Sequence, residues 1–359
     1  MTASMTPADI ARLRLLNQHI DGARFTQPAE VVAWLGAVQS QDYAGAKWAL
    51  GLRLPGSVDD EIERAFTSGA ILRTHVMRPT WHFVAPADIR WMLALTAPRV
   101  HAISAYYYRK LELDDALLRR SDETLAEALR GGRERTRDEL RAALEQSNVI
   151  LGDPLRLGYL LIHAELEGII CSGARRGKQQ TWALLEERVP PAKTLERDEA
   201  LAELTRRYFT SHGPATARDF AWWSGLSSAD VRRGLEIAGS DLQRMEGDGQ
   251  TYWLAPPARE TIDMAHLLPN YDEYTVGYQG YDALFQGLGE ERLVYRHALV
   301  IEGRIAGGWK RGLTKSAATI ELKTLAPPTE GQRQAVIEAA RRYGAFLGLP
   351  IELSWLSGD

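Results

Sequence analysis

Residues 197–255 read RDEALAELTRRYFTSHGPATARDFAWWSGLSSADVRRGLEIAGSDLQRMEGDGQTYWLA. Residues 197–213 have the apolar spacing of an amphipathic helix that ends at a Gly-Pro pair. Two shorter helices follow, and each begins at a capping hydroxyl, Thr216 in one and Ser227 in the other. Two strand-like runs on either side of a glycine turn then predict a β-hairpin. Helices followed by a hairpin in this order predict a winged helix, a fold that many DNA-binding proteins use.

The same order is predicted twice more upstream, as a likeness of elements and not of sequence. The predicted helices lie at 124–132, 136–147 and 153–168 before a hairpin at 169–185, and at 7–20, 27–38 and 57–69 before a hairpin at 70–86. After residue 260 short strands and Gly turns predominate, with one helix, which predicts a small barrel or curled sheet. We therefore predict an α+β fold of three tandem winged-helix domains, at 1–115, 116–192 and 193–260, followed by a β-rich C-terminal domain at 261–359.

Composition narrows the class of protein. The 359 residues are 45% apolar and 25% charged, as in ordinary folded proteins, and suffice for several domains. Cys171 is the only cysteine, and the N-terminus lacks the features of a secretory signal, so we predict a cytoplasmic, nucleoid-associated protein with no membrane segment. The net charge of −4 argues mildly against a nucleic-acid partner, yet basic residues gather in residues 73–110, 173–182 and 292–323.

Two glutamines stand out in the stretch AVQSQDYAGAKW, residues 37–48. Gln39 and Gln41 end the longest uncharged run of the chain. On a helix, side chains two residues apart point about 200° from each other, so both amides can face one ligand only in extended backbone. If they act together, the preceding helix must end around Val38 to Gln39. The alternative is that both amides are solvated at a helix end.

Three stretches together resemble a known family: VQSQDY, LRTHVMRPTWHFV and LLPNYDEYTVGYQ. In this order and separation they resemble the AlkZ-like winged-helix DNA glycosylases over nearly the whole chain. The resemblance implies excision of N7-alkylated purines, including those in bulky adducts or interstrand crosslinks, from double-stranded DNA. It also implies that Gln39 and Gln41 form the catalytic Gln-x-Gln motif. Some relatives are known only as winged-helix DNA-binding proteins, so a non-catalytic DNA-binding protein, a transcription regulator or a protein scaffold remains an alternative.

The chemistry of the motif suits such a substrate. An N7-alkylated purine already carries a positive charge and leaves without protonation, so the enzyme needs chiefly to place a water and stabilise the sugar cation. A carboxamide is no useful base, but it can hold a water by geometry. We predict that Gln41 holds the water and that Gln39 helps to fix the water or the deoxyribose. Asp42 either acts as base or cation stabiliser, or pairs with a surface cation or the local backbone.

The remaining expectations concern DNA contacts and cofactors. His75 and His82 either support catalysis near the sugar or belong to the core. The residues expected to contact DNA phosphates, with binding that weakens as salt rises, are Arg78, Arg175, Arg176, Lys178, Lys310, Arg311 and Lys315. We expect no metal, no cofactor, and no lyase activity because the motif lacks an amine nucleophile. We further expect a monomer with no obligate protein partner.

Overall fold

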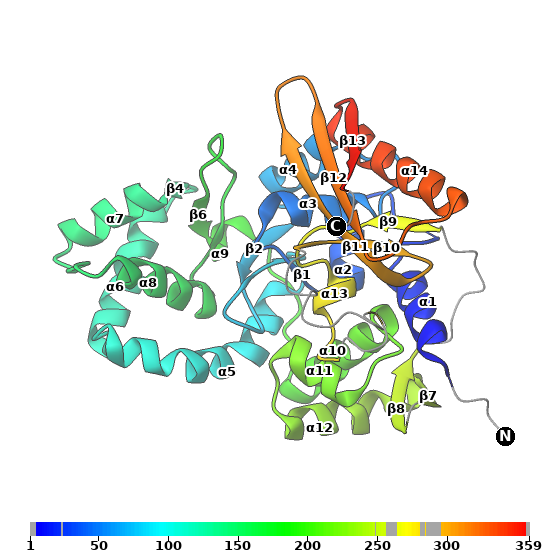
Figure 1. The fold of residues 1–359 in the computed structure, drawn as a ribbon. Coiled ribbons are helices and arrows are strands. Elements are labelled where there is room, and N and C mark those ends of the chain that lie inside the picture. Colours follow the sequence, from blue (N-terminus) through cyan, green and yellow to red (C-terminus); the bar gives the residue numbers. More distant parts are fainter. Residues whose placement is uncertain are drawn as a thin grey trace.

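Three units of the chain repeat one order of helices and strands. The computed structural model describes residues 5–22, 24–247, 249–255, 264–280, 284 and 296–356 (Figure 1). The first unit contains α2 (Pro28–Leu35), β1 (Val38–Gln39), α3 (Tyr43–Gly51), α4 (Asp59–Ser68), β2 (Leu72–His75) and β3 (Trp81–Val84). Its strands form an antiparallel sheet in the order β1-β3-β2, so that the last strand lies between the other two.

The second and third units have the same arrangement. The second contains α6 (Asp115–Leu129), β4 (Arg135–Thr136), α7 (Arg137–Gln146), α8 (Pro154–Leu166), β5 (Ile170–Ser172) and β6 (Thr181–Leu184), with strand order β4-β6-β5. The third contains α10 (Arg197–Ser211), α11 (Ala217–Ser224), α12 (Ser228–Ala238), the short 3-10 turn η1 (Gly239–Asp241), β7 (Gln243–Gly247) and β8 (Gln250–Leu254). Here Ala215 bridges to Trp253 of β8 and takes the place of the first strand.

The helix caps confirm several of the helix starts predicted from the sequence. Thr216 and Ser227 each accept a hydrogen bond from a backbone N–H in the first turn of their helices, as expected. Thr136 and Glu139 form a reciprocal capping box at the start of α7. The first unit differs from expectation, because α3 was not predicted. In addition, α1 (Pro7–Asn17) packs on the third unit, where its Asn17 donates to the Gly213 carbonyl at 2.7 Å.

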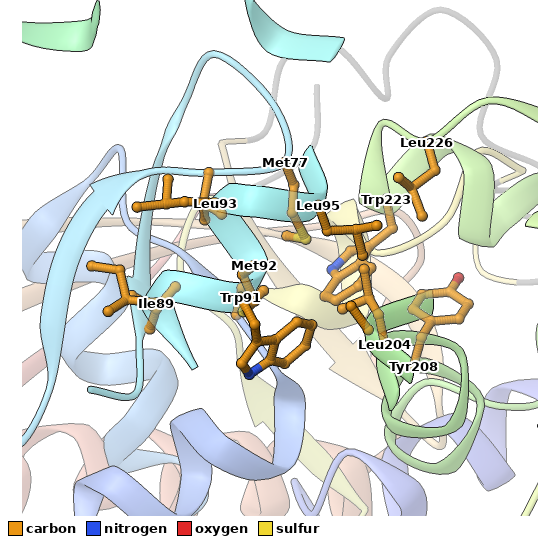
Figure 2. Packing of buried hydrophobic residues seen from close by; sticks show 14 of the residues in the cluster. Met77, Ile89, Trp91, Met92, Leu93, Leu95, Leu204, Tyr208, Trp223 and Leu226 are labelled. Carbon is orange, nitrogen blue, oxygen red and sulfur yellow. The ribbon is translucent and has the colours of Figure 1, made fainter. Parts of the chain in front are cut away.

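Two helices connect the repeating units. The 22-residue α5 (Ile89–Lys110) leads from the first unit to the second, and α9 (Leu185–Arg188) follows the second (Figure 1). Residues of α5 and of the β2–β3 connection pack directly on the third unit. Figure 2 shows Met77 and Met92 in one cluster with Leu204 and Trp223. The first and third units therefore share a buried apolar core.

The C-terminal part is β-rich, as predicted, and its described strands form one open sheet in place of a barrel. The elements are β9 (Ala265–Leu267), α13 (Glu273–Val276), β10 (His297–Ile301), β11 (Arg304–Leu313), β12 (Ala318–Thr324), α14 (Glu330–Leu347) and β13 (Ile351–Trp355). Strand order is β13-β12-β11-β10-β9, with only the β12–β13 pair parallel. The boundary expected at residue 260 lies outside the described residues.

This sheet and α14 share a core with the first unit. The ring of Trp48 on α3 lies 5.0 Å from Tyr343 and 5.1 Å from Phe346 of α14, and its Nε1 donates to the Leu267 carbonyl. The first unit therefore packs against the C-terminal sheet on one side and against the third unit on another. None of the helices in the described part of the chain has both the length and the apolar character that a bilayer crossing requires.

Candidate active site

The Gln39–Gln41 segment lies outside any helix. Helix α2 ends at Leu35, where Gly36 turns the chain with φ +79°, and Gln39 lies in strand β1. The ladder continues to Ser40, whose N–H donates to the Trp81 carbonyl at 2.7 Å. Helix α2 ends earlier than expected, yet the prediction that the two glutamines lie in non-helical backbone is confirmed. The strand ends at Gln39, and the chain bends at Gln41 before α3 begins.

The two amides have different surroundings. Gln39 is 8% exposed, and its backbone N–H donates to Glu273 Oε1 at 2.7 Å. Its carboxamide makes no hydrogen bond to any residue in the described part of the chain. Gln41 is exposed, and its Oε1 accepts from the Trp81 N–H at 3.4 Å. The arrangement thus has a recessed amide with free hydrogen-bonding groups and a second amide nearer the surface.

Asp42 contacts the backbone of α3 and a cation. It is the N-cap of α3, where Oδ1 accepts from the Gly45 N–H at 3.0 Å. The same carboxylate lies 3.4 Å from the Arg311 guanidinium. Its oxygens therefore contact both the local backbone and a cation from the C-terminal sheet.

His82 lies directly across from Gln39. The two residues are partners in the β1–β3 ladder, so their side chains lie on the same face of the sheet. His82 is fully buried, and Nδ1 donates to the Thr80 carbonyl at 2.9 Å. Burial and the charge of Arg78 lower the pKa of His82 to about 3, so the ring is neutral. Nε2 is then a hydrogen-bond acceptor, and it has no partner among the described residues.

Buried glutamates bind both edges of this sheet. Glu165, on α8, accepts from the backbone N–H and Nδ1 of His75 on β2, at 3.0 and 2.6 Å, and from Trp182 Nε1 at 2.6 Å. His75 is thereby fixed, with its ring 4.2 Å from Trp81. Glu273 is the corresponding residue at the β1 edge.

Glu273 holds the strand that carries Gln39. Its Oε1 binds the Gln39 N–H, and its Oε2 accepts from Trp223 Nε1 at 2.9 Å and lies 3.4 Å from His212 Nε2. Burial raises the pKa of Glu273, but the hydrogen bond and charge of His212 and the Gln39 amide outweigh it and bring the pKa below its ordinary value. Three distant parts of the chain thus meet behind β1.

The basic side chains of the second-unit hairpin fall into two groups. Arg175 is turned inward, with its guanidinium 4.4 Å from the Tyr43 ring centre and 3.5 Å from Glu63. Arg176 is half exposed and pairs with Glu139 at 2.9 Å. Lys178 is exposed at the tip of the hairpin. Lys178 and Arg176 are therefore open to a polyanion, whereas Arg175 links the second unit to the first.

The C-terminal sheet carries the other basic group. Lys310 is 80% exposed and lies 3.3 Å from Glu321, and Lys315 is exposed between β11 and β12. Arg311 is mostly covered, because it pairs with Asp42 and donates to the Tyr343 hydroxyl at 3.2 Å. A cavity of about 590 Å³ opens here, and its basic lining residues are Arg296, Lys310, Arg311 and Lys323. Arg78 is half-buried in the β2–β3 connection, close to Gly225 of the third unit.

Comparison with known proteins identifies the family. The family model described as DNA glycosylase AlkZ-like matches residues 32–346. The chain belongs to the AlkZ-like DNA glycosylase family. It is 26% identical over 311 residues to the interstrand DNA cross-link repair glycosylase of Streptomyces sahachiroi, covering 79% of this chain and 83% of that protein. The solved structure of the Streptomyces sahachiroi DNA glycosylase AlkZ has the same fold, with TM-score 0.81, 22% identity and coverage of 99% and 100% of the two chains.

In this AlkZ-like glycosylase the predicted residues are only partly gathered. Gln39 and His82 are partners in the β1–β3 ladder, Gln41 accepts from the N–H of the adjacent Trp81, and Asp42 follows at the start of α3. Sequence reasoning missed Glu165 and Glu273. Glu273 lies within the quoted stretch LLPNYDEYTVGYQ, which was the one available signal for it.

Proposed function

We propose that this AlkZ-like glycosylase is monofunctional and hydrolyses the N-glycosidic bond of N7-alkylated purines in double-stranded DNA, in base-excision repair. The observation that carries the proposal is the free carboxamide of Gln39 beside the neutral ring of His82. The name of its Streptomyces sahachiroi relative, an interstrand DNA cross-link repair glycosylase, supports crosslinked purines as substrates.

Neutral groups suffice for this reaction. The cationic base departs with the electron pair of the glycosidic bond, which neutralises it, and leaves an oxocarbenium-like sugar. Water then bonds to the anomeric carbon and loses a proton to solvent. Gln39 Oε1 is the acceptor that orients this water, with the neutral His82 ring buried beside it on the neighbouring strand, while Gln41, nearer the surface, fixes the water or the deoxyribose. His75 is bound by Glu165 and packs its ring on Trp81, at the edge of the sheet opposite the Gln39 strand.

The state of the Lys47 amine supports hydrolysis without lyase activity. Lys47 on α3 is 6% exposed and lies 2.7 Å from Asp59 and 2.9 Å from Glu63. The Lys47 amine is engaged by two carboxylates and is therefore not free to form a Schiff base with the sugar. Abasic DNA is therefore the product that we assign.

The repeated unit supports a winged-helix architecture. Each unit has a helix, a first strand or bridge, two helices and a hairpin, with the first strand beside the last. We assign three winged helices to residues 1–115, 116–192 and 193–260 and a C-terminal domain to 261–359. Arg176, Lys178, Lys310 and Lys315 would contact DNA phosphates, with Arg78, Arg175 and Arg311 nearer the lesion. We assign a monomer that acts in the cytoplasm on nucleoid DNA.

Release of a modified base tests the proposal. The protein is incubated with duplex DNA containing N7-methylguanine under single-turnover conditions, and free base and alkali-labile sites are measured. Gln39→Ala should lower the rate about 100-fold, because water placement depends on this amide. Gln41→Ala should lower it about tenfold or more. Gln146→Ala, an exposed amide on α7, is the matched control and should keep the native rate.

The competing functions give different results in the same experiment. Tight binding to one DNA sequence without release of any base would identify a regulator. The absence of both base release and DNA affinity would identify a protein scaffold. Native rates in both glutamine variants would show that the motif is not catalytic.

A further inference from the structure

Two histidines and a glutamate meet where the second unit joins α5, away from the glutamine motif. His101 lies on α5, while His163 and Glu167 lie one turn apart at the end of α8, beside it (Figure 1). Their ligand atoms all lie within 4.8 Å of one another, and His101 Nε2 is 3.0 Å from Glu167 Oε1. Side chains at i and i+4 on one helix, with a third from a neighbouring helix, form a common donor set for Zn²⁺.

The outer ring nitrogens are already held. His163 Nδ1 lies 3.1 Å from the Asp122 carboxylate of α6, and His101 Nδ1 lies 2.9 Å from the Tyr108 hydroxyl. In metal sites the nitrogen that does not bind the ion usually contacts a carboxylate or another polar group, which fixes the ring and its tautomer. Nε2 of each ring is therefore left for an ion.

We propose that His101, His163 and Glu167 bind one divalent transition-metal ion, with Zn²⁺ as the preferred ion and water in the fourth position. Imidazole ligands favour zinc, copper and nickel over magnesium and calcium, whose ligands are oxygens. The side chain of Glu167 is 48% exposed, so an ion can enter from solvent. The ion would tie α5 to α8 and fix the second unit relative to the first.

Zinc binding here would differ from the expectation, based on the sequence, that the chain binds no metal. The spacing His163-x-x-x-Glu167 is visible in the sequence but has no third ligand nearby. His101 comes from a different helix, and only the packing of α5 on α8 brings it to the pair.

Metal content of the full-length protein tests the site. The protein is stripped with a chelator and equilibrated with Zn²⁺, and bound zinc per chain and the midpoint of thermal unfolding are measured. We expect one zinc per chain and a midpoint that rises with zinc concentration, because the ion binds only the folded state. Co²⁺ should show the intense visible bands of a tetrahedral site.

Variants separate this site from adventitious binding. Glu167→Gln and His101→Gln should each lose the zinc and the rise in midpoint, and Asp122→Asn should weaken zinc binding about 10–100-fold. His297→Gln, outside the cluster, should keep both. Since Glu167 is half exposed, its variant should unfold at the native midpoint in chelator, which shows that it folds. Zinc retained by Glu167→Gln, or no zinc bound by the native protein, would overturn the proposal.

Discussion

Replacing Glu273 with glutamine probes whether the backbone anchor behind Gln39 matters for catalysis. Glutamine has nearly the same shape but only one acceptor oxygen and no charge. It cannot accept from the Gln39 N–H on one side and from Trp223 and His212 on the other. At least one buried donor must then face the NH₂ group, which is itself a donor.

The size of the effect follows from these contacts. A buried donor without an acceptor costs about 1–3 kcal/mol, and hydrogen bonds to a charged acceptor are worth about 1 kcal/mol more than neutral ones. Glu273→Gln should therefore destabilise the protein by about 2–4 kcal/mol, within the 5–15 kcal/mol or so of a typical domain. Release of N7-methylguanine should slow about 10–100-fold, because a shift of about 1 Å in a positioning group can cost about 100-fold.

Glu165→Gln is a matched control for this change. Glu165 binds one strand N–H, one histidine and one tryptophan, as Glu273 does, but at the opposite edge of the sheet. Both variants should lower the midpoint of thermal unfolding by similar amounts. Only Glu273→Gln should slow single-turnover base release from saturated enzyme, with little change in the Kd for DNA. A native rate in Glu273→Gln, or equal slowing in both variants, would refute the anchoring role.

Four further substitutions test other residues. His82 has a pKa of about 3 in the folded protein against 6.5 ordinarily, so the unfolded state binds more protons between these values and stability falls as pH falls. Between pH 7 and pH 5 the free energy of unfolding of His82→Gln should therefore fall by about 2 kcal/mol less than that of the native protein. Denaturant titrations at the two pH values measure this difference. Asp42→Asn should retain the helix cap and base release within about threefold, since asparagine caps as well as aspartate; a loss of about 100-fold would instead identify Asp42 as the base. Lys178→Ala and Lys315→Ala should each reduce the slope of log Kd for DNA against log salt by about 0.9, measured by fluorescence anisotropy, and unchanged slopes would exclude phosphate contacts there.

Local signals in the sequence predicted much of the fold. The capping hydroxyls at Thr136, Thr216 and Ser227 and the alternating runs that follow them act over a few residues, so they can be read without the fold. The non-helical backbone at Gln39 followed from the condition that both amides act on one ligand. Helix α3 was missed because its glycines and alanines obscure an apolar face, and burial against α14 stabilises it.

Long-range partners could not be predicted in the same way. Glu273 lies 234 residues from Gln39, and Glu165 lies 90 residues from His75. No signal in the sequence showed that Arg311, expected to contact phosphate, also pairs with Asp42 and donates to Tyr343 once the C-terminal sheet packs on the first unit. Charge and spacing indicate which residues can act, whereas packing determines which of them are already engaged.

The contact between Gln39 and Glu273 also has a consequence for synthesis of the chain. Both glutamines leave the ribosome early, but the carboxylate that holds their strand is made 234 residues later. Domains generally begin to fold in the order in which they emerge. A nascent chain that stops before Glu273 would carry the whole motif and lack its anchor, so the full rate of base release would require these 234 further residues to be made and packed.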